Sequence, residues 1–372
     1  MHYLITGHTG FKGAWLSLWL NSLGHEVSGI SLDPIPDSLF DRANVSESIQ
    51  NDFRIDIRKS DEVKSALLQA KPDVVFHMAA QPLVRESYAD PRYTFETNVM
   101  GTLSLLEAVS SVDSVKAHVV VTTDKVYRNI NQVAGYVEND PLGGHDPYSS
   151  SKAMADLLTQ SWISSFPGTP TTIVRAGNVI GGGDVSKDRL FPDLLNGYLS
   201  GQAPVLRYPG AVRPWQHVLD CLNGYLKLSD ALLKGNGLGE WNFGPETSSF
   251  VNVGDVATLV NELIGESAPS WTTTGEPQPH EANLLALDAR KAELELNWHN
   301  KLNFQDAVRW TVEWQTEFID AMNDARIISI SQIREFENYD KARIAQTKAK
   351  IIGLYEEKGY FLADVDIVTE PF

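Results

Sequence analysis

The sequence has a single cysteine, few basic residues and no long apolar run. Cys221 stands alone among 372 residues, which excludes a disulfide framework and a Cys-rich zinc site. No stretch reaches the roughly eighteen uninterrupted apolar residues of a membrane-spanning helix. The first residues, MHYLITGHTG, lack the basic start and the cleavage site of a signal peptide. We therefore expect a cytoplasmic protein without a metal site and without membrane association.

Positive charge is scarce as well. Thirty-one Lys and Arg stand against 48 Asp and Glu, which gives a net charge of −17. Proteins that bind nucleic acid or anionic lipid usually carry a basic surface, so neither partner is expected. Any anionic ligand must be held by local positive side chains. Hydrophobic residues make up 42% and charged residues 21% of the chain, which is typical of a folded globular protein.

The first half of the chain alternates between apolar runs and helical patterns, which predicts parallel strands joined by crossover helices. The predicted strands are residues 2–6, 26–32, 73–78, 117–123 and 171–176, and the predicted helices are about 11–23, 60–70, 91–112 and 148–166. These elements predict an α/β fold with a Rossmann-type doubly wound parallel sheet and a smaller C-terminal substrate-binding domain.

The second half is punctuated by Gly and Pro, as in GGGDVSKD and YPGAVRPWQH, which indicates loops between short elements. A predicted helix places Phe304, Val308 and Val312 on one face beside Trp310 and Trp314, which indicates core packing. The expected domains are residues 1–180 for nucleotide binding, with segments of about 210–255 returning to that domain, residues 181–209 and 256–335 for substrate binding, and a charged helical tail of unknown role at 336–372.

A glycine-rich turn directly follows the first predicted strand and opens the first predicted helix. Glycines in this context let the chain turn tightly, let the backbone approach a pyrophosphate, and let the helix pack closely on the sheet. The turn therefore predicts a dinucleotide site formed by Gly7, Thr9, Gly10, Phe11, Lys12 and Gly13.

Later strand ends supply further predicted cofactor contacts. Asp33 follows the second strand, where a carboxylate can bind the ribose hydroxyls and repel a 2′-phosphate, so NAD is favoured over NADP. The alternative for Asp33 is a turn cap before Pro34. His77 is interpreted as a packed strand residue. The other predicted contacts are Asp56 and Ile57 beside the adenine and Ala79, Ala80 and Gln81 at the next strand end.

Tyr148 and Lys152 are four residues apart, which places both side chains on one face of a predicted helix. A lysine ammonium near a phenol favours the phenolate, so we expect a lowered pKa that makes Tyr148 a usable base. The alternative is an ordinary surface pair. Thr123 ends a preceding strand, where its hydroxyl can hydrogen-bond the oxygen that the tyrosine deprotonates.

Together these features match the extended short-chain dehydrogenase/reductase superfamily. The runs TGHTGFKGAWLSLWL, FHMAAQPLVRESY, NVMGTLSLLEA, TTDKVY, LGGHDPYSSSK, RAGNVIGGGD and RPWQHVLD resemble those of CDP-glucose 4,6-dehydratases over about residues 1–250. The resemblance implies that Thr123, Tyr148 and Lys152 carry out the oxidation, with Tyr148 and Lys152 also touching the cofactor. Asn98 is expected to steady this triad, and Asp124 and Lys125 to carry out the dehydration.

Lys125 is the position that separates the related families. In dTDP-glucose dehydratases it is a glutamate, and 4-epimerases have small residues in place of both Asp124 and Lys125, so the lysine favours the CDP-glucose branch. The implied reaction oxidises carbon 4 of the sugar, eliminates water across carbons 5 and 6, and returns the hydride to carbon 6, giving CDP-4-keto-6-deoxy-glucose for deoxysugar synthesis. Protonated Asp124 would give its proton to the departing hydroxyl. The alternative for Asp124 and Lys125 is a solvated turn.

The diphosphate of a sugar nucleotide needs local cations, and arginine offers a planar fork for phosphate. Arg213 stands in the same place as the phosphate-binding arginine of related sugar-nucleotide enzymes, whereas the other two candidate arginines could be ordinary surface charges. The predicted substrate contacts are Gln81, Asn178, Arg189, Arg207 and Arg213.

Three alternatives stay open: a dehydratase of another nucleotide-glucose, a sugar-nucleotide 4-epimerase, and a redox-inert protein that only binds NAD or a sugar nucleotide. A protein that only binds its ligand would not need all five of the residues Tyr148, Lys152, Thr123, Asp124 and Lys125, so their presence argues against the third alternative. The family also implies a homodimer formed through two helices of each subunit.

Overall fold

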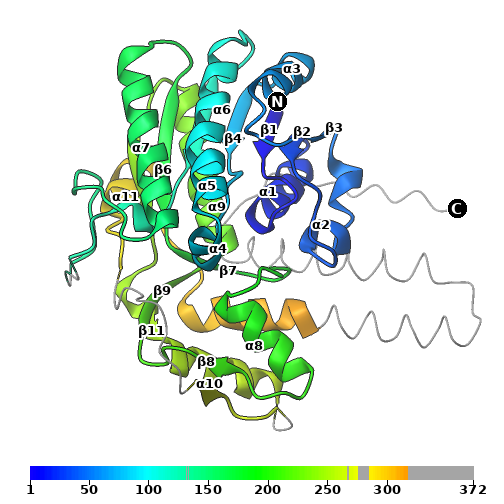
Figure 1. The fold of residues 1–372 in the computed structure, drawn as a ribbon, viewed down its shortest axis with the longest axis vertical. Helices are drawn as coiled ribbons and strands as arrows, with labels where there is room; N and C mark the ends of the chain where they lie inside the picture. The colour runs from blue at the N-terminus through cyan, green and yellow to red at the C-terminus, as the bar shows by residue number, and fades with distance from the viewer. Residues whose placement is uncertain (131, 133, 266–267, 275–284, 317–372) are drawn as a thin grey trace, which may run out of the picture.

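A seven-stranded parallel sheet forms the centre of the molecule (Figure 1). The structure, a computed structural model, describes residues 1–130, 132, 134–265, 268–274 and 285–316. The strand order is β10-β6-β5-β4-β1-β2-β3, so the sheet is doubly wound from β1. The strands are β1 His2–Thr6, β2 Glu26–Ser31, β3 Asn51–Arg54, β4 Val74–His77, β5 Ala117–Val121, β6 Thr171–Ala176 and β10 Gly239–Phe243.

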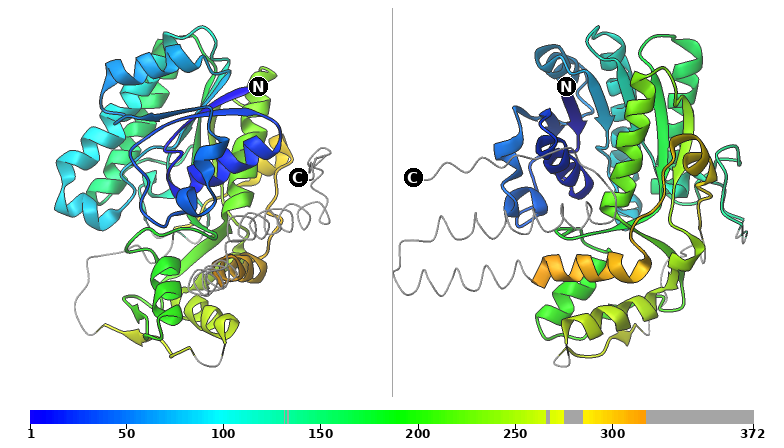
Figure 2. Two further views of the ribbon diagram at one scale, coloured as in Figure 1. Left: turned by 90° about the vertical axis from the view of Figure 1, so that its right-hand side faces the viewer. Right: turned by 180° about the vertical axis from the view of Figure 1, so that it is seen from behind.

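Helices cover both faces of this sheet, as Figure 2 shows from two further sides. Successive strand residues point to opposite faces, so Leu4 packs with Leu67 and Leu105 on one face, whereas Ile5 belongs to the core on the other. The first face carries α3 Ser60–Ala70, α4 Val84–Ala89, α5 Pro91–Phe95, α6 Gly101–Ser110 and α7 Pro147–Ser165, and the second carries α1 Phe11–Ser22, α2 Leu39–Arg42, α9 Val218–Leu233 and α11 Arg290–Leu296.

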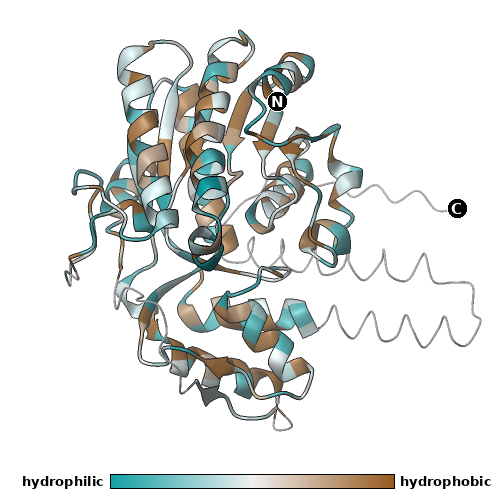
Figure 3. Cartoon of the chain, viewed as in Figure 1, coloured by the Kyte–Doolittle hydropathy of each residue, from teal (hydrophilic) through white to brown (hydrophobic). Residues whose placement is uncertain are grey.

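The smaller part of the molecule lies beyond the carboxyl ends of the strands. It contains a three-stranded sheet in the order β11-β9-β7 and a two-stranded sheet of β12 and β8. Figure 3 shows hydrophobic colour along its helix α10, whose buried residues join the main core. Its elements are β7 Asn178–Ile180, α8 Leu190–Leu199, β8 Val205–Leu206, β9 Val212–His217, β11 Phe250–Asn252, α10 Val253–Ile264 and β12 Thr272–Thr273.

The α/β prediction is confirmed, and the predicted strands and helices of the first half lie within two residues of their observed bounds, with one exception. The helix expected at 91–112 is divided into α5, a π-helical turn at Glu96–Met100 and α6. Strand β10 was not predicted, whereas β3 corresponds to the strand-like run that precedes Asp56 and Ile57 in the sequence. Strand β10 pairs with β6, so the chain returns to the main sheet, whereas β9 and β11 at residues 212–217 and 250–252 join the smaller sheet.

The helix at 304–316 packs into the core as predicted, with Phe304, Val308, Trp310 and Val312 buried and Trp314 packed against them. His77 is likewise a buried strand residue, hydrogen-bonded to Thr6 and Thr102. The predicted tail at 336–372 lies outside the described residues. No helix within the described ranges is long and apolar enough to cross a membrane.

Candidate active site

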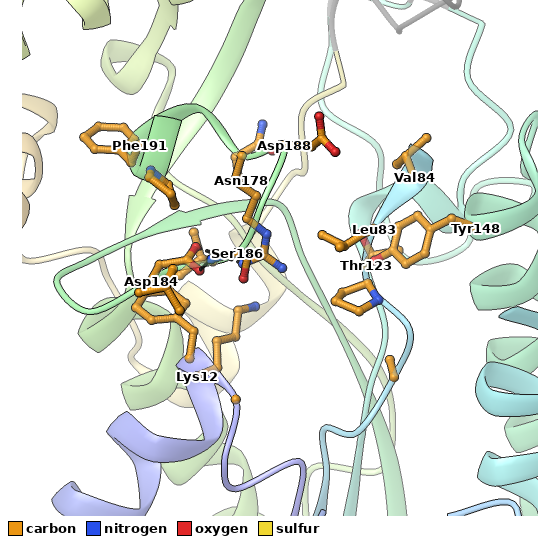
Figure 4. Close-up of a pocket in the computed structure, with 18 of the residues that line it drawn as sticks. Lys12, Leu83, Val84, Thr123, Tyr148, Asn178, Asp184, Ser186, Asp188 and Phe191 are labelled. Atoms are coloured by element: carbon orange, nitrogen blue, oxygen red, sulfur yellow. Dashed lines mark hydrogen bonds and ion pairs between the residues drawn. The ribbon is translucent and has the colours of Figure 1, made fainter. Parts of the chain in front are cut away.

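A cavity of about 620 Å³ opens where the carboxyl ends of the main strands face the smaller part of the molecule. Figure 4 shows side chains that enter it from α1, from the strand ends and from the loop after β7. Every residue predicted from the sequence to act on cofactor or substrate lines this cavity, except Gln81 and Asn98. The fold thus collects residues from position 7 to position 213 in one space.

The glycine-rich turn is closely packed against the sheet. A Cβ atom on Gly13 would collide with the carbonyl oxygen of Gly7, and one on Gly7 would lie 2.9 Å from the Cα of Ala79. Gly7 also has a φ of +77°, which L side chains rarely adopt. The turn therefore leaves the amino end of α1 open to the cavity, the arrangement that binds a pyrophosphate.

Asp33 and Asp56 lie on the same side of the cavity as this turn. Asp33 is exposed two residues after β2, and Thr9 holds the strand end through hydrogen bonds to Ser31 at 2.6 Å and to the Leu32 carbonyl at 3.1 Å. Asp56 pairs with Arg58 at 2.6 Å, and these hydrogen bonds lower the pKa of Asp56. The Asp56 carboxylate is thus an ionised acceptor at the cavity edge.

Tyr148 and Lys152 lie on α7, which begins with Pro147 and is capped by Asp146, whose carboxylate accepts from the Ser149 amide at 2.9 Å. The expectation that Lys152 lowers the pKa of Tyr148 is wrong for this structure. Burial raises the pKa of Tyr148 to about 12, although its hydrogen bond with Thr123 acts in the opposite direction. The Lys152 ammonium instead donates to the Val121 carbonyl at 2.9 Å. Burial, together with the charge of Lys12, lowers the pKa of Lys152 to about 8.

Asp124 is buried three residues after β5, with 4% of its surface exposed, so it is no part of a solvated turn. Its carboxylate accepts from the Thr123 hydroxyl at 2.9 Å. Burial raises the pKa of Asp124, although the charges of Lys125 and Arg213 oppose the rise. A carboxyl group that retains its proton here can serve as an acid. Lys125 is half-buried and lines the same end of the cavity.

Asn98 and Gln81 are buried and do not line the cavity. The Asn98 amide bonds both to the backbone of Gln81, at 2.8 and 3.1 Å, and to the Ser151 hydroxyl at 2.8 Å. Asn98 thereby ties the end of β4 to α7 between Tyr148 and Lys152. The predicted contact of Gln81 with ligands is not what the structure shows, because its side-chain amide donates to Thr94 and to the Leu83 carbonyl.

The opposite wall carries Asn178 on β7, Arg213 on β9, and Arg189 and Arg207. Arg189 is ion-paired with Asp184 at 3.0 Å, and Arg207 lies 3.8 Å from Asp188. Sequence reasoning named both arginines but neither of these acids.

Four charged lining residues were therefore missed: Asp193 on α8, Arg85 on α4, and two further acids, Asp184 and Asp188. The two acids lie in the GGGDVSKD segment, which the sequence predicts as a loop and whose first four residues end the run RAGNVIGGGD. Arg85 lies in the FHMAAQPLVRESY run, whose pattern carries no chemical signal of its own.

Comparison with known proteins places these residues in a family. The family model for GDP-mannose 4,6 dehydratase matches residues 4–311. The chain is 43% identical to a CDP-glucose 4,6-dehydratase of Salmonella typhimurium over 89% of this chain and 95% of that protein. It is 28% identical to a dTDP-glucose 4,6-dehydratase of Escherichia coli over 86% of this chain and 95% of that protein.

Two solved structures share the fold at 25% identity. A UDP-glucose 4-epimerase of Thermus thermophilus in complex with NAD matches with a TM-score of 0.74 over 84% of this chain and 98% of that one. A dTDP-glucose 4,6-dehydratase of Streptomyces venezuelae with NAD bound matches with a TM-score of 0.73 over 84% and 96%. With its glycine-rich turn, its Tyr148–Lys152 pair and a family model that spans most of its length, the chain belongs to the GDP-mannose 4,6 dehydratase family of extended short-chain dehydrogenases/reductases.

Proposed function

We propose that this chain is an NAD-dependent dehydratase that converts CDP-glucose into CDP-4-keto-6-deoxy-glucose and water. The observation that carries the proposal is the placement of Asp124 and Lys125 beside Thr123 and Tyr148 at one end of a single cavity. An epimerase needs the oxidising residues alone, whereas a dehydratase also needs an acid and a base for elimination. The CDP-glucose 4,6-dehydratase relative, at 43% identity, supports the choice of nucleotide.

The cavity fits NAD at the glycine-rich turn, whose tight course past Ala79 allows no side chain on Gly7 or Gly13. The residues that we assign to it are Gly7, Thr9, Gly10, Phe11, Lys12, Gly13, Asp33, Asp56, Ile57, Ala79 and Ala80. When bound, NAD supplies the oxidant for carbon 4 and returns the same reducing equivalents to carbon 6. Asp33 excludes a 2′-phosphate by charge repulsion.

Tyr148 removes the proton of the carbon 4 hydroxyl, assisted by the Thr123 hydroxyl with which it is hydrogen-bonded. With a pKa of about 12 the phenol is protonated at neutral pH. Before it can take the carbon 4 proton, the phenol must therefore release its own proton to solvent, and Lys152, which lies one turn further along the same face of α7, stabilises the phenolate that remains. Asn98 positions this helix through Ser151.

Elimination follows because the carbon 4 ketone makes the proton at carbon 5 acidic. Lys125 takes that proton, and Asp124 gives its own proton to the departing carbon 6 hydroxyl. The buried position of Asp124 raises its pKa, which is the direction that an acid in this role requires. Arg213 and Asn178 hold the sugar nucleotide from the opposite wall.

The test is to incubate the protein and NAD separately with CDP-, dTDP-, UDP- and GDP-glucose and to look by mass spectrometry for the loss of one water. We expect that loss with CDP-glucose and not in the Tyr148→Phe control. An unchanged mass in all four reactions contradicts a dehydratase. An isomerised sugar of unchanged mass indicates an epimerase, and water loss with another nucleotide corrects the substrate.

We also propose that the protein is a cytoplasmic homodimer. The two subunits would meet through α7 and through the neighbouring segment formed by the π-helical turn at Glu96–Met100 and α6. Met154 and Leu157 on α7 are 47% and 51% exposed, and Met100 before α6 is 51% exposed, which leaves an apolar strip on neighbouring helices. Analytical ultracentrifugation of the native protein is expected to give a dimer, and Leu157→Glu a monomer. A native monomer would contradict the proposal.

A further inference from the structure

Asp188 joins two arginines that come from different parts of the fold. Its carboxylate lies 3.2 Å from Arg85 on α4 and 3.8 Å from Arg207, which follows β8. Arg207 also donates a hydrogen bond to the Asp188 backbone carbonyl at 3.2 Å. All three residues line the cavity, and we call them the Arg85–Asp188–Arg207 cluster. The cluster therefore bridges the main sheet domain and the smaller part across the substrate space.

The backbone at Asp188 is in an uncommon conformation. Its φ is 61°, in the left-handed region where Asp and Asn are tolerated better than most residues. Figure 4 shows its carboxylate directed toward the side of the cavity where Leu83 and Val84 lie, away from Asp184 and Ser186 on the same loop. The turn at Asp188 thus directs this carboxylate toward Arg85 on α4, across the cavity.

Acids on this wall partly neutralise its arginines. Arg189 is paired with Asp184, Arg85 and Arg207 share Asp188, and Asp193 also interacts electrostatically with Arg207 and Arg85. A carboxylate between two guanidinium groups uses the same donors that a phosphate would use, since both anions accept parallel hydrogen bonds from the arginine fork. A phosphate carries more charge and more acceptor oxygens than a carboxylate, so it can replace one.

We propose that Arg85 and Arg207 form an anion subsite for a phosphate group of the nucleotide sugar, and that Asp188 occupies this subsite until the substrate displaces it. The inference rests on the proposed function for the identity of the ligand as a nucleoside diphosphate sugar. Arg85 thereby becomes a substrate-binding residue, and Asp188 becomes a competitor that weakens ground-state binding and assists product release.

Exchange of this kind is feasible because the pairs are accessible. The side chains of Arg85, Asp188 and Arg207 are 46%, 40% and 25% exposed, and such ion pairs are individually weak and screened by salt. By contrast, the Arg175–Asp156 pair has side chains only 1% and 0% exposed and has no route to exchange with a ligand.

The test measures binding of CDP by isothermal titration calorimetry at low salt, so it does not depend on turnover. Asp188→Asn keeps a residue that tolerates the positive φ but removes the competing charge. We expect it to bind CDP about three- to tenfold more tightly than the native protein, whereas Arg85→Gln and Arg207→Gln weaken binding by a similar factor. Glu62→Gln, which removes an equal charge from the distant Lys59 pair on α3, is the matched control and is expected to change nothing.

The decisive comparison places Asp188→Asn in a protein that already carries Arg85→Gln and Arg207→Gln. No cation is left to be released there, so the affinity for CDP should not change further. The proposal is overturned if Asp188→Asn raises the affinity for CDP by the same factor in that double variant. It is also overturned if Asp188→Asn does not raise this affinity in the native protein. Failure of the proposed function would show separately, as CDP binding without loss of water from CDP-glucose.

Discussion

The two walls of the cavity differ in how their charged groups are held. On the wall formed by β5 and α7, Thr123, Asp124 and Lys152 are each at most 8% exposed, and each is hydrogen-bonded within the protein. On the opposite wall, Asp188 is 40% exposed and shared between two arginines. These three groups of the first wall are thus held inside the protein, whereas the ion pairs of the second wall can change partners.

This difference separates chemistry from recognition. Burial changes the proton affinity of groups on the first wall, as the raised pKa of Asp124 and the lowered pKa of Lys152 show, and such groups control reaction steps. Exposed ion pairs on the second wall cost little free energy to break. A bound substrate can therefore replace one partner, and these pairs affect the affinity for substrate. Changes on the first wall should therefore lower kcat, and changes on the second should alter KM.

Tyr148→Phe is the strongest test of the first wall. The ring remains packed but the base is lost, so kcat should fall by roughly 10²–10⁴-fold, the usual contribution of general base catalysis. The cofactor should stay oxidised with CDP-glucose bound, which absorbance spectroscopy can follow, and KM should change little. Near-normal turnover would mean that another group deprotonates the sugar.

Lys125→Met, on the same wall, should separate the oxidation step from the elimination step. Oxidation at carbon 4 does not need the amine, so reduced cofactor should accumulate on the enzyme while product release falls by about 10²-fold or more. Exchange of the carbon 5 hydrogen with deuterated solvent should stop. Exchange at the native rate would exclude Lys125 as the base.

Lys152→Met tests the burial of charge on the first wall. The folded pKa of about 8 lies below the ordinary 10.5, so the unfolded chain binds more protons between these values and the native free energy of unfolding rises with pH across that window. Below it, the buried charge costs on the order of 3 kcal/mol.

The Lys152→Met variant should therefore be inactive yet at least as stable as the native protein at neutral pH, and it should lack that rise between about pH 8 and pH 10. Urea denaturation as a function of pH measures both. An identical pH dependence in the two proteins would contradict the burial of a charged Lys152.

Asp33→Asn has the smallest expected effect because this carboxylate is exposed at the cofactor end of the cavity. Removing its charge should weaken NAD binding and improve NADP binding by about tenfold or less, since exposed charges interact through water. Fluorescence titration of both cofactors measures the ratio. A native protein that binds both equally would show that Asp33 does not select between them.

The first wall was largely predictable from the sequence because its signals are local. The glycine-rich turn, the Tyr148–Lys152 spacing and the hydroxyl at the end of β5 each occupy a short segment whose secondary structure follows from its own pattern. The pKa of Tyr148 was not predictable, because it depends on how completely the fold buries the phenol.

The second wall was less predictable because its contacts join distant segments. Arg85 and Asp188 are 103 positions apart in the numbering, 188 less 85, and no local pattern links them. Strand β10 was missed for a related reason: it is a short run, and its pairing with β6 is set by the tertiary fold. Gln81 stands at a strand end that faces the cavity, yet its side chain turns to Thr94.

The central claim is that one cavity oxidises carbon 4 and then eliminates water with internal return of hydrogen. The most direct measurement uses CDP-glucose deuterated at carbon 4, with the product analysed by mass spectrometry and NMR after reaction in ordinary and in deuterated water. The account predicts a product that has lost one water, retains the carbon 4 deuterium at carbon 6, and takes a solvent hydrogen at carbon 5. A product that has lost the label to solvent, or one that keeps its original hydrogen at carbon 5, would contradict it.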